Sequence, residues 1–184
     1  MRLTLSRPPW VSPELAVSTA DGERLLDGTW SEAAQRYAAD RAAKLAARKR
    51  PPIGVQPFLN RVIDERFEAH GWFGGSGRFV KERVWLRITF RHQMSLGADV
   101  VDALKVIKKG IAEVAIIAAA DHEFLRVVSP NDAAALTSYE KLRAEFLDLE
   151  GVIDVPLLLG RLTPRSDLPP ATASIVFGPR PREG

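Results

Sequence analysis

Apolar and polar side chains alternate along residues 83–91, as they do in a strand that has two different faces. One face is apolar and consists of Leu86, Ile88 and Phe90. The other face consists of Trp85, Arg87, Thr89 and Arg91. We expect this second face to be cationic and to suit an anion, since a divalent metal ion needs oxygen ligands from carboxylates.

Two apolar runs predict further strands, at residues 111–119 and 155–162. The first run lies between Gly110 and Asp121 and is typical of a buried strand in a parallel sheet. Helical spacing of apolar residues predicts helices at residues 31–49, 58–70, 98–109 and 133–149. The strand at 83–91, the helix at 98–109 and the strand at 111–119 therefore form a predicted crossover unit. In its helix, we expect Val101, Leu104 and Ile107 to face the core.

The two ends of the chain lack a sustained period. Residues 1–30 hold Pro8, Pro9 and Pro13, and we expect an irregular arm anchored by Trp10 and Trp30. Residues 163–184 are rich in proline and are expected to form an extended tail. The sequence thus predicts a single domain over residues 1–184, with its core at 31–162.

Two polar motifs contain residue types found in binding sites, but we interpret both as connections. Gly74-Gly75-Ser76-Gly77 runs from a helix into a strand, whereas a phosphate-binding loop runs from a strand into a helix. Asp121-His122-Glu123 follows a predicted strand, and adjacent residues in an extended segment point to opposite sides. We therefore expect a hairpin tip at the first motif and a polar loop at the second.

Composition limits the classes of function. The 184 residues are 46% hydrophobic, which is enough for one sizeable core. There is no cysteine and there are only three scattered histidines, so a disulfide framework is excluded and a zinc site is not expected. We see no apolar run long enough for a secretory signal or a membrane span, which favours a cytoplasmic protein without a membrane partner. The net charge of +3 permits a nucleic acid partner without requiring one.

Basic residues gather in two places. The first is the end of the helix at 31–49 and comprises Arg41, Lys44, Arg48, Lys49 and Arg50, beside the single acid Asp40. The second surrounds the strand at 83–91 and comprises Arg78, Lys81, Arg83, Arg87 and Arg91, beside the single acid Glu82. Each group has two interpretations, a solvated surface or a contact with a phosphate backbone.

Several segments between residues 56 and 163 carry a family resemblance through their order and spacing. They are Gln56-Pro57-Phe58-Leu59-Asn60 opening a helix that ends at Gly71-Trp72, the strand at 86–90, Lys109-Gly110-Ile111-Ala112-Glu113-Val114, residues 139–149, and Val152-Ile153-Asp154-Val155-Pro156. Together they resemble type II restriction endonucleases of the BglII/BstYI kind. The similarity covers a little over half of the chain.

The resemblance implies an α/β fold with a restriction-endonuclease-like three-layer core, in which a central mixed β-sheet is flanked by helices. It also implies homodimerisation and magnesium-dependent cleavage of duplex DNA. The family's active strand reads like Val-Glu-Val-Gln-Phe, with an aspartate shortly before it. In this chain Arg87 stands at the position of the glutamate, Thr89 at that of the glutamine, and Arg78 near that of the aspartate. The metal ligands that the resemblance implies are therefore replaced.

Our leading hypothesis is a catalytically inactive, dimeric protein that binds duplex DNA and needs no metal or other cofactor. The candidate DNA contacts are Arg78, Lys81, Arg83, Arg87, Arg91, His92, Arg48, Lys49 and Arg50.

Two alternatives stay open. In the first, relocated acids hold magnesium and the chain is an active endonuclease; the candidates are Glu65, Glu82, Asp99 and Asp102. Asp99 and Asp102 also suit the amino-terminal end of a helix, where the dipole favours negative charge. In the second alternative, the basic face meets an acidic surface of a protein partner.

Overall fold

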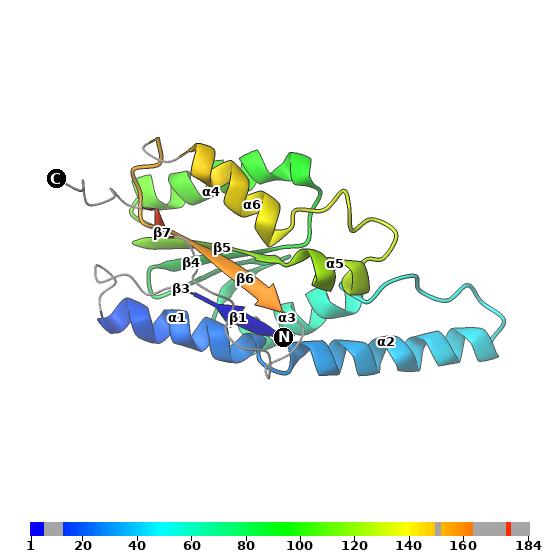
Figure 1. Ribbon diagram of the computed structural model, residues 1–184. Coiled ribbons are helices and arrows are strands. Elements are labelled where there is room, and N and C mark those ends of the chain that lie inside the picture. The colour runs from blue at the N-terminus through cyan, green and yellow to red at the C-terminus, as the bar shows by residue number, and fades with distance from the viewer. Residues whose placement is uncertain (6–12, 150–151, 164–175, 178–184) are drawn as a thin grey trace.

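A mixed β-sheet runs through the middle of the molecule, in a computed structural model that describes residues 1–5, 13–149, 152–163 and 176–177 (Figure 1). Its seven strands are β1 (Arg2–Thr4), β2 (Phe73–Gly75), β3 (Arg78–Lys81), β4 (Val84–Thr89), β5 (Val114–Ala120), β6 (Leu157–Thr163) and β7 (Val176–Phe177). The order across the sheet is β1-β6-β5-β4-β3-β2, and β7 also pairs with β6. Strands β4, β5 and β6 are parallel, and the other pairings are antiparallel.

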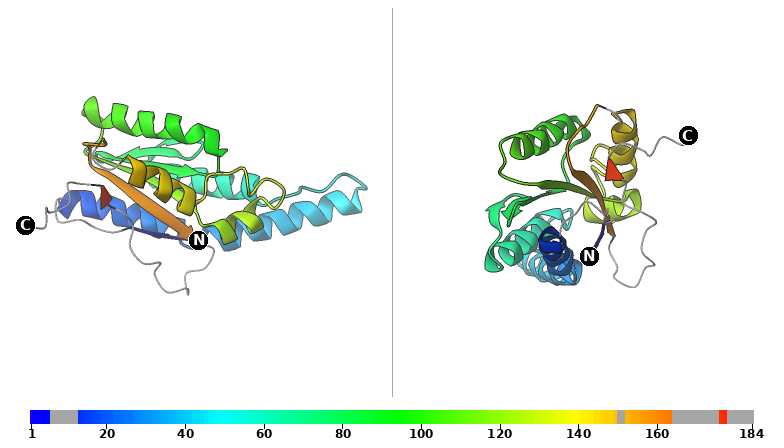
Figure 2. Two further views of the ribbon diagram at one scale, coloured as in Figure 1. Left: turned by 45° about the horizontal axis from the view of Figure 1, so that its top comes forward. Right: turned by 90° about the vertical axis from the view of Figure 1, so that its left-hand side faces the viewer.

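Helices cover both faces of this sheet (Figures 1 and 2). One face carries α1 (Pro13–Leu26), α2 (Thr29–Ala46) and α3 (Gln56–Ala69), while the other carries α4 (Leu96–Lys108) and α6 (Tyr139–Asp148). A short 3-10 helix, η1 (Gln93–Ser95), precedes α4, and α5 (His122–Val128) follows β5. The expected α/β class with a mixed sheet is confirmed.

Each face of the sheet has its own hydrophobic core. On the first, Phe67 of α3 stacks on Phe79 of β3 with ring centroids 4.4 Å apart. On the second, Leu142 and Phe146 of α6 pack with Ile117 of β5. Because β5 is buried on both faces, all seven of its residues are buried and apolar. The prediction of a buried parallel strand, reached through the crossover helix α4, is confirmed.

The first thirty residues are not an irregular arm. They contain β1, which extends the sheet beside β6, and α1, whose Leu15, Leu25 and Leu26 are buried in the core. The prolines obscured the helical pattern of α1 in the sequence. Pro13 is nevertheless compatible with the helix, because it is the first residue of α1, where its missing N–H costs no helical hydrogen bond. Trp30 packs on Phe124 of α5, whereas Trp10 lies outside the described residues. In the predicted tail, residues 176–177 form β7.

Three sequence-based assignments on the second half of the chain need correction. Residues 121–123 are not a loop, because the Asp121 side chain accepts a hydrogen bond from the Phe124 N–H and caps α5. The helix expected at 133–149 begins only at Tyr139, capped by Ser138, since residues 130–135 form a turn. In α4, Val101 faces outward and is 45% exposed, because the helix turns Asp99 toward the sheet instead.

The glycine-rich motif is a hairpin tip, as the sequence predicts. Ser76 and Gly77 connect β2 to β3, and Gly77 has a φ of 76°. A Cβ atom at Gly77 would overlap the carbonyl oxygen of Ile88. Glycine is thus required by a close approach of backbone to backbone, and not by a phosphate.

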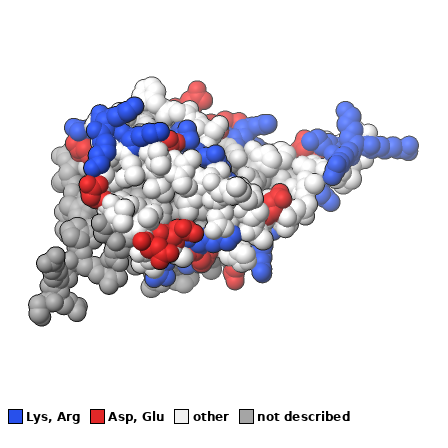
Figure 3. Space-filling view, turned by 90° about the horizontal axis from the view of Figure 1, so that it is seen from above, with Lys and Arg blue, Asp and Glu red and all other residues white. Residues whose placement is uncertain are grey.

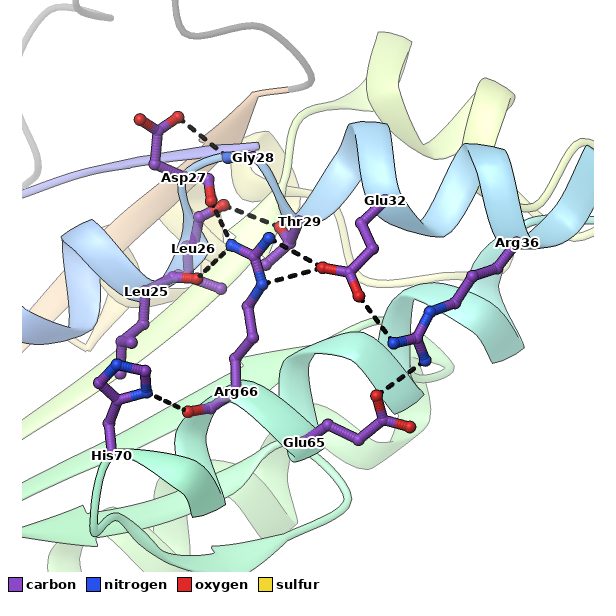
Figure 4. A network of polar contacts seen from close by, with 10 residues as sticks. All are labelled: Leu25, Leu26, Asp27, Gly28, Thr29, Glu32, Arg36, Glu65, Arg66 and His70. Carbon is purple, nitrogen blue, oxygen red and sulfur yellow. Dashed lines mark hydrogen bonds and ion pairs between the residues drawn. The ribbon is translucent and has the colours of Figure 1, made fainter.

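A polar network centred on Arg66 joins α3 to the turn between α1 and α2 (Figure 4). The Arg66 guanidinium donates to the carbonyl oxygens of Leu25 and Asp27 and to the carboxylate of Glu32. Hydrogen bonds from Arg66 lower the pKa of Glu32. Arg36 lies at the edge of the network, where it pairs with Glu32 and Glu65 at the surface. Arg66 therefore fixes the direction in which α2 leaves the body of the protein.

We predict that Arg66→Ala lowers the free energy of unfolding by about 1–3 kcal/mol, because two carbonyl oxygens lose a donor and the Glu32 carboxylate keeps only Arg36. Arg36→Ala is the matched control and should cost less than about 1 kcal/mol, since Arg36 pairs with two carboxylates near the surface and donates to no backbone carbonyl of the described residues. Urea unfolding of both variants measures the difference. Equal losses would show that the Arg66 network has no special role.

Candidate functional site

Arg78 and Arg87, the two positions where the resemblance implies metal ligands, lie directly opposite each other on β3 and β4. Their side chains lie on one face of the sheet, since both make ion pairs with α4. Arg78 Nη2 lies 2.6 Å from Asp102 Oδ2, and Arg87 Nε lies 3.0 Å from Asp99 Oδ1. The register therefore brings together the two positions at which the resemblance implies metal ligands.

Arg91 completes what we call the arginine–aspartate cluster: Arg78, Arg87, Arg91, Asp99 and Asp102. Arg91 Nη1 lies 3.1 Å from the same Asp99 oxygen that Arg87 contacts. Arg87 also donates from Nη1 to the carbonyl oxygen of Ser76 at 2.9 Å. Three guanidinium groups thus meet two carboxylates, and one positive charge remains uncompensated within the cluster.

The expectation of an open cationic face on β4 is wrong for Arg87, whose side chain is only 3% exposed. Helices α4 and α6 cover this face, and Trp85 and Thr89 are buried beneath them as well. Burial lowers the pKa of Arg87, which the negative charge of Asp99 opposes. In this conformation Arg87 cannot reach a phosphate. The arginines at the rim of the cluster remain accessible, with side-chain exposures of 48% for Arg78 and 44% for Arg91.

The four acids considered as relocated metal ligands do not converge on one point. Asp99 and Asp102 lie beside β4 but are ion-paired with arginine. Glu65 pairs with Arg36 on the opposite face of the sheet, and Glu82 accepts a hydrogen bond from Ser18. Among the described residues, no group of three or more His, Asp or Glu side chains is placed to hold a metal ion.

Two further basic candidates beside β4 are held by acids. Lys81 Nζ lies 2.9 Å from Asp21 Oδ2. Partial burial alone would raise the pKa of Asp21, but hydrogen bonds from Lys81, Arg24 and Trp72 lower it to about 2. Arg83 is exposed in the turn after β3 and pairs with Glu113 at 2.8 Å. His92 is also exposed, at the residue that precedes η1.

The basic residues that follow α2 are different, because their side chains are exposed. Arg48, Lys49 and Arg50 are exposed, and none of them forms an ion pair within the described part of the chain. The last turns of α2 extend beyond the sheet as a free arm, which we call the α2 arm (residues 38–50). Figure 3 shows Lys and Arg side chains gathered at its far end.

The α2 arm and the rim of the arginine–aspartate cluster lie toward the same end of the sheet. The connection from α2 to α3 reaches the carboxyl end of β4, where Gln56 Nε2 donates to the carbonyl oxygen of Phe90 at 3.1 Å. Arg91 and His92 follow Phe90 directly. The carboxyl ends of parallel strands are where ligands of open α/β sheets commonly bind. Exposed cations from two separate sequence regions therefore share this end.

Sequence reasoning missed one polar cluster at the same strand ends. Arg161 of β6 lies 3.0 Å from the buried carboxylate of Asp121, and its guanidinium lies 6.0 Å from the ring centre of Tyr139. The sequence did contain a signal for this cluster, because Arg161 is the one charged residue in β6. This cluster connects β6, the start of α5 and the start of α6, and we assign it a structural role.

Comparison with known proteins finds no matching family model and no matching curated protein. In the described part of the chain, no helix combines the length and the apolar character that crossing a bilayer requires.

We predict that Asp99→Ala destabilises the protein by about 3–5 kcal/mol, because it leaves Arg87 charged and buried without its carboxylate. Replacing both partners, as in Arg87→Met with Asp99→Leu, should recover most of the loss, since a buried apolar pair has no desolvation penalty. Asp102→Ala on the same helix is the control and should cost less than about 1 kcal/mol, because its pair with Arg78 is partly exposed. Urea unfolding is the measurement, and equal losses for Asp99→Ala and Asp102→Ala would contradict the interpretation.

Proposed function

We propose that this chain is a duplex-DNA-binding protein on a restriction-endonuclease-like core that has lost its nuclease activity. The observation that carries the proposal is the pairing of Arg78 with Arg87 across β3 and β4. These are the positions at which the resemblance implies an aspartate and a glutamate. Residues paired across two antiparallel strands have Cβ atoms about 4.5–5.5 Å apart, close enough for two carboxylates to share a metal ion.

The element order supports the restriction-endonuclease-like core. Helix α3, strands β2 to β4, helix α4 and strand β5 follow one another in the order of the segments that carry the resemblance. The mixed sheet with helices on both faces is consistent with the architecture that the resemblance implies.

The arginines oppose metal-dependent hydrolysis at this position. Two unit charges of like sign 4 Å apart repel by about 4 kcal/mol at an intermediate effective dielectric constant. Asp99 and Asp102 are the carboxylates that contact these two arginines, and both are already neutralised by guanidinium groups. A metal ion at this point would have to displace arginine from the acids. Cleavage through a carboxylate-held magnesium ion is therefore not part of the proposed function.

Binding is supported by the exposed cations at the carboxyl ends of the parallel strands, which include Arg91 and the α2 arm. Arginine and lysine that neutralise phosphates release the counterions condensed on DNA, which makes binding stronger at low salt. Such binding needs no particular base sequence.

We predict that the purified protein binds a mixed-sequence DNA duplex and does not cut it. Fluorescence anisotropy between about 50 and 200 mM salt should show affinity falling steeply with salt concentration, since each phosphate contact adds about 0.9 to the log–log slope. A gel with and without magnesium tests cleavage on the same samples. Magnesium-dependent nicking that Asp102→Asn abolishes would instead establish the endonuclease alternative. Absence of binding at the lowest salt concentration would favour a protein partner.

We further propose that the chain acts as a homodimer, as the resemblance implies. An apolar groove of about 620 Å³ lies between η1 and α4 on one side and α6 on the other. Met94 and Val101 line it and are 90% and 45% exposed, which supports contact with a second copy because exposed apolar patches commonly mark interfaces.

We predict that the wild-type protein sediments as a dimer at micromolar concentration and that Met94→Glu with Val101→Glu shifts it to a monomer. The two added carboxylates would be buried without partners in such an interface. Val127→Glu, at an exposed apolar residue of α5, is the control. A wild-type protein that is monomeric throughout the concentration range would refute dimerisation.

A further inference from the structure

The α2 arm is a helix end with almost no support from the body of the protein. The first half of α2 is anchored, with Thr29 and Ala33 buried and Tyr37 packed edge-on against Phe58 at 5.8 Å. Beyond Tyr37 every residue up to Arg50 is exposed except Asp40 and Lys44, which form an ion pair at 2.8 Å with each other. The arm is therefore held by its own helical propensity rather than by packing.

Alanine supplies that propensity and keeps the arm narrow. The exposed part of the helix contains Ala38, Ala39, Ala42, Ala43 and Ala46. Alanine is the best helix former, so this stretch can stay helical without burying a face. At about 1.5 Å per residue, residues 38–46 extend about 13 Å along the helix axis. Arg48 then ends the helix in the left-handed region, with a φ of 53°.

The positive charge at the end of the arm indicates which class of partner the arm can bind. Arg41, Lys44, Arg48, Lys49 and Arg50 stand against the single acid Asp40, so the arm is strongly cationic. Two exposed apolar side chains, Leu45 and Ile53, lie beside these cations and are each 53% exposed. A polyanion that also presents apolar groups fits this surface, and the thymine methyl groups in the major groove of DNA are such groups.

We infer that the α2 arm enters the major groove of the duplex while its basic end contacts the flanking phosphates. This inference rests on the proposed DNA binding. The major groove is about 12 Å wide and admits an α-helix, whereas the minor groove, at about 6 Å, does not. The arm's small side chains allow close approach to the base edges. The arm, and not the covered face of β4, is then the element that carries the affinity.

Two triple variants separate this inference from the proposed function. Arg48→Ala with Lys49→Ala and Arg50→Ala removes three charges from the arm. Lys105→Ala with Lys108→Ala and Lys109→Ala removes three charges from the carboxyl-terminal end of α4. This end leads back to the amino end of β5, so it lies at the opposite end of the parallel strands. In anisotropy titrations, the arm variant should lose roughly tenfold or more in affinity, and its salt slope should fall by up to about 2.7. The α4 variant should bind like the wild type.

A third variant tests whether the arm acts as a helix. Ala43→Pro keeps every charge but breaks the helix within the exposed stretch, at a local cost of about 3 kcal/mol. Because the stretch does not pack on the body, the thermal unfolding temperature should stay close to that of the wild type while DNA affinity falls. Wild-type affinity for Ala43→Pro would show that only flexible charge is needed, and the groove-entering helix would be ruled out.

Methylation interference identifies the groove. We expect that methyl groups on guanine N7, in the major groove, weaken binding and that methyl groups on adenine N3, in the minor groove, do not. The opposite pattern would overturn the inference. If the wild type binds DNA but the arm triple variant binds equally well, the inference is wrong and the proposed function stands. If the wild type does not bind DNA, the proposed function fails first.

Discussion

The buried ion pair between Arg87 and Asp99 determines how α4 lies on the sheet. Asp99 is 1% exposed and accepts charge-assisted contacts from Arg87 and Arg91, so the first turns of α4 must turn this carboxylate toward β4. That rotation directs Val101 to the outside and leaves small Ala103 against the sheet. Charged groups are costly to bury unless they are paired, and the pair therefore excludes other orientations of the helix.

The same constraint divides the basic residues into two classes. Arginines on the sheet and its rim meet acids of α4, which neutralises most of their charge. Arg48, Lys49 and Arg50 are exposed and form no ion pair within the described part of the chain, and they follow a helix that the Arg66 network directs away from the sheet. A net charge of +3 for the whole chain says little about either class, because position and pairing decide which cations can meet a partner.

Local patterns were sufficient to predict most of the central elements of the fold. The apolar run of β5, the spacing of Leu59, Val62, Ile63 and Phe67 in α3, and the alternation in β4 each depend on one periodicity and were read correctly. The prediction for the first thirty residues failed because β1 is a three-residue edge strand, too short to show a period, and because the nearby prolines obscured the helical pattern of α1. The prediction of the site failed for a different reason. Alternation shows that Arg87 and Thr89 share a face, but only the tertiary position of Asp99 decides whether that face is open or covered.

The arginine–aspartate cluster also gives a physical reason for an arginine at position 87. A buried ion pair contributes little stability beyond what an apolar pair of similar size would give, so stability alone does not require it. What it adds is geometry, since one carboxylate oxygen holds two guanidinium groups and thereby links β4, its carboxyl end and α4. In this arrangement Arg87 is a packing element, at the position where the resemblance implies a metal ligand. In the proposed function, DNA at this end of the sheet would meet Arg78, Arg91 and the α2 arm, which attract phosphates, while Asp99 and Asp102 are already paired with arginine.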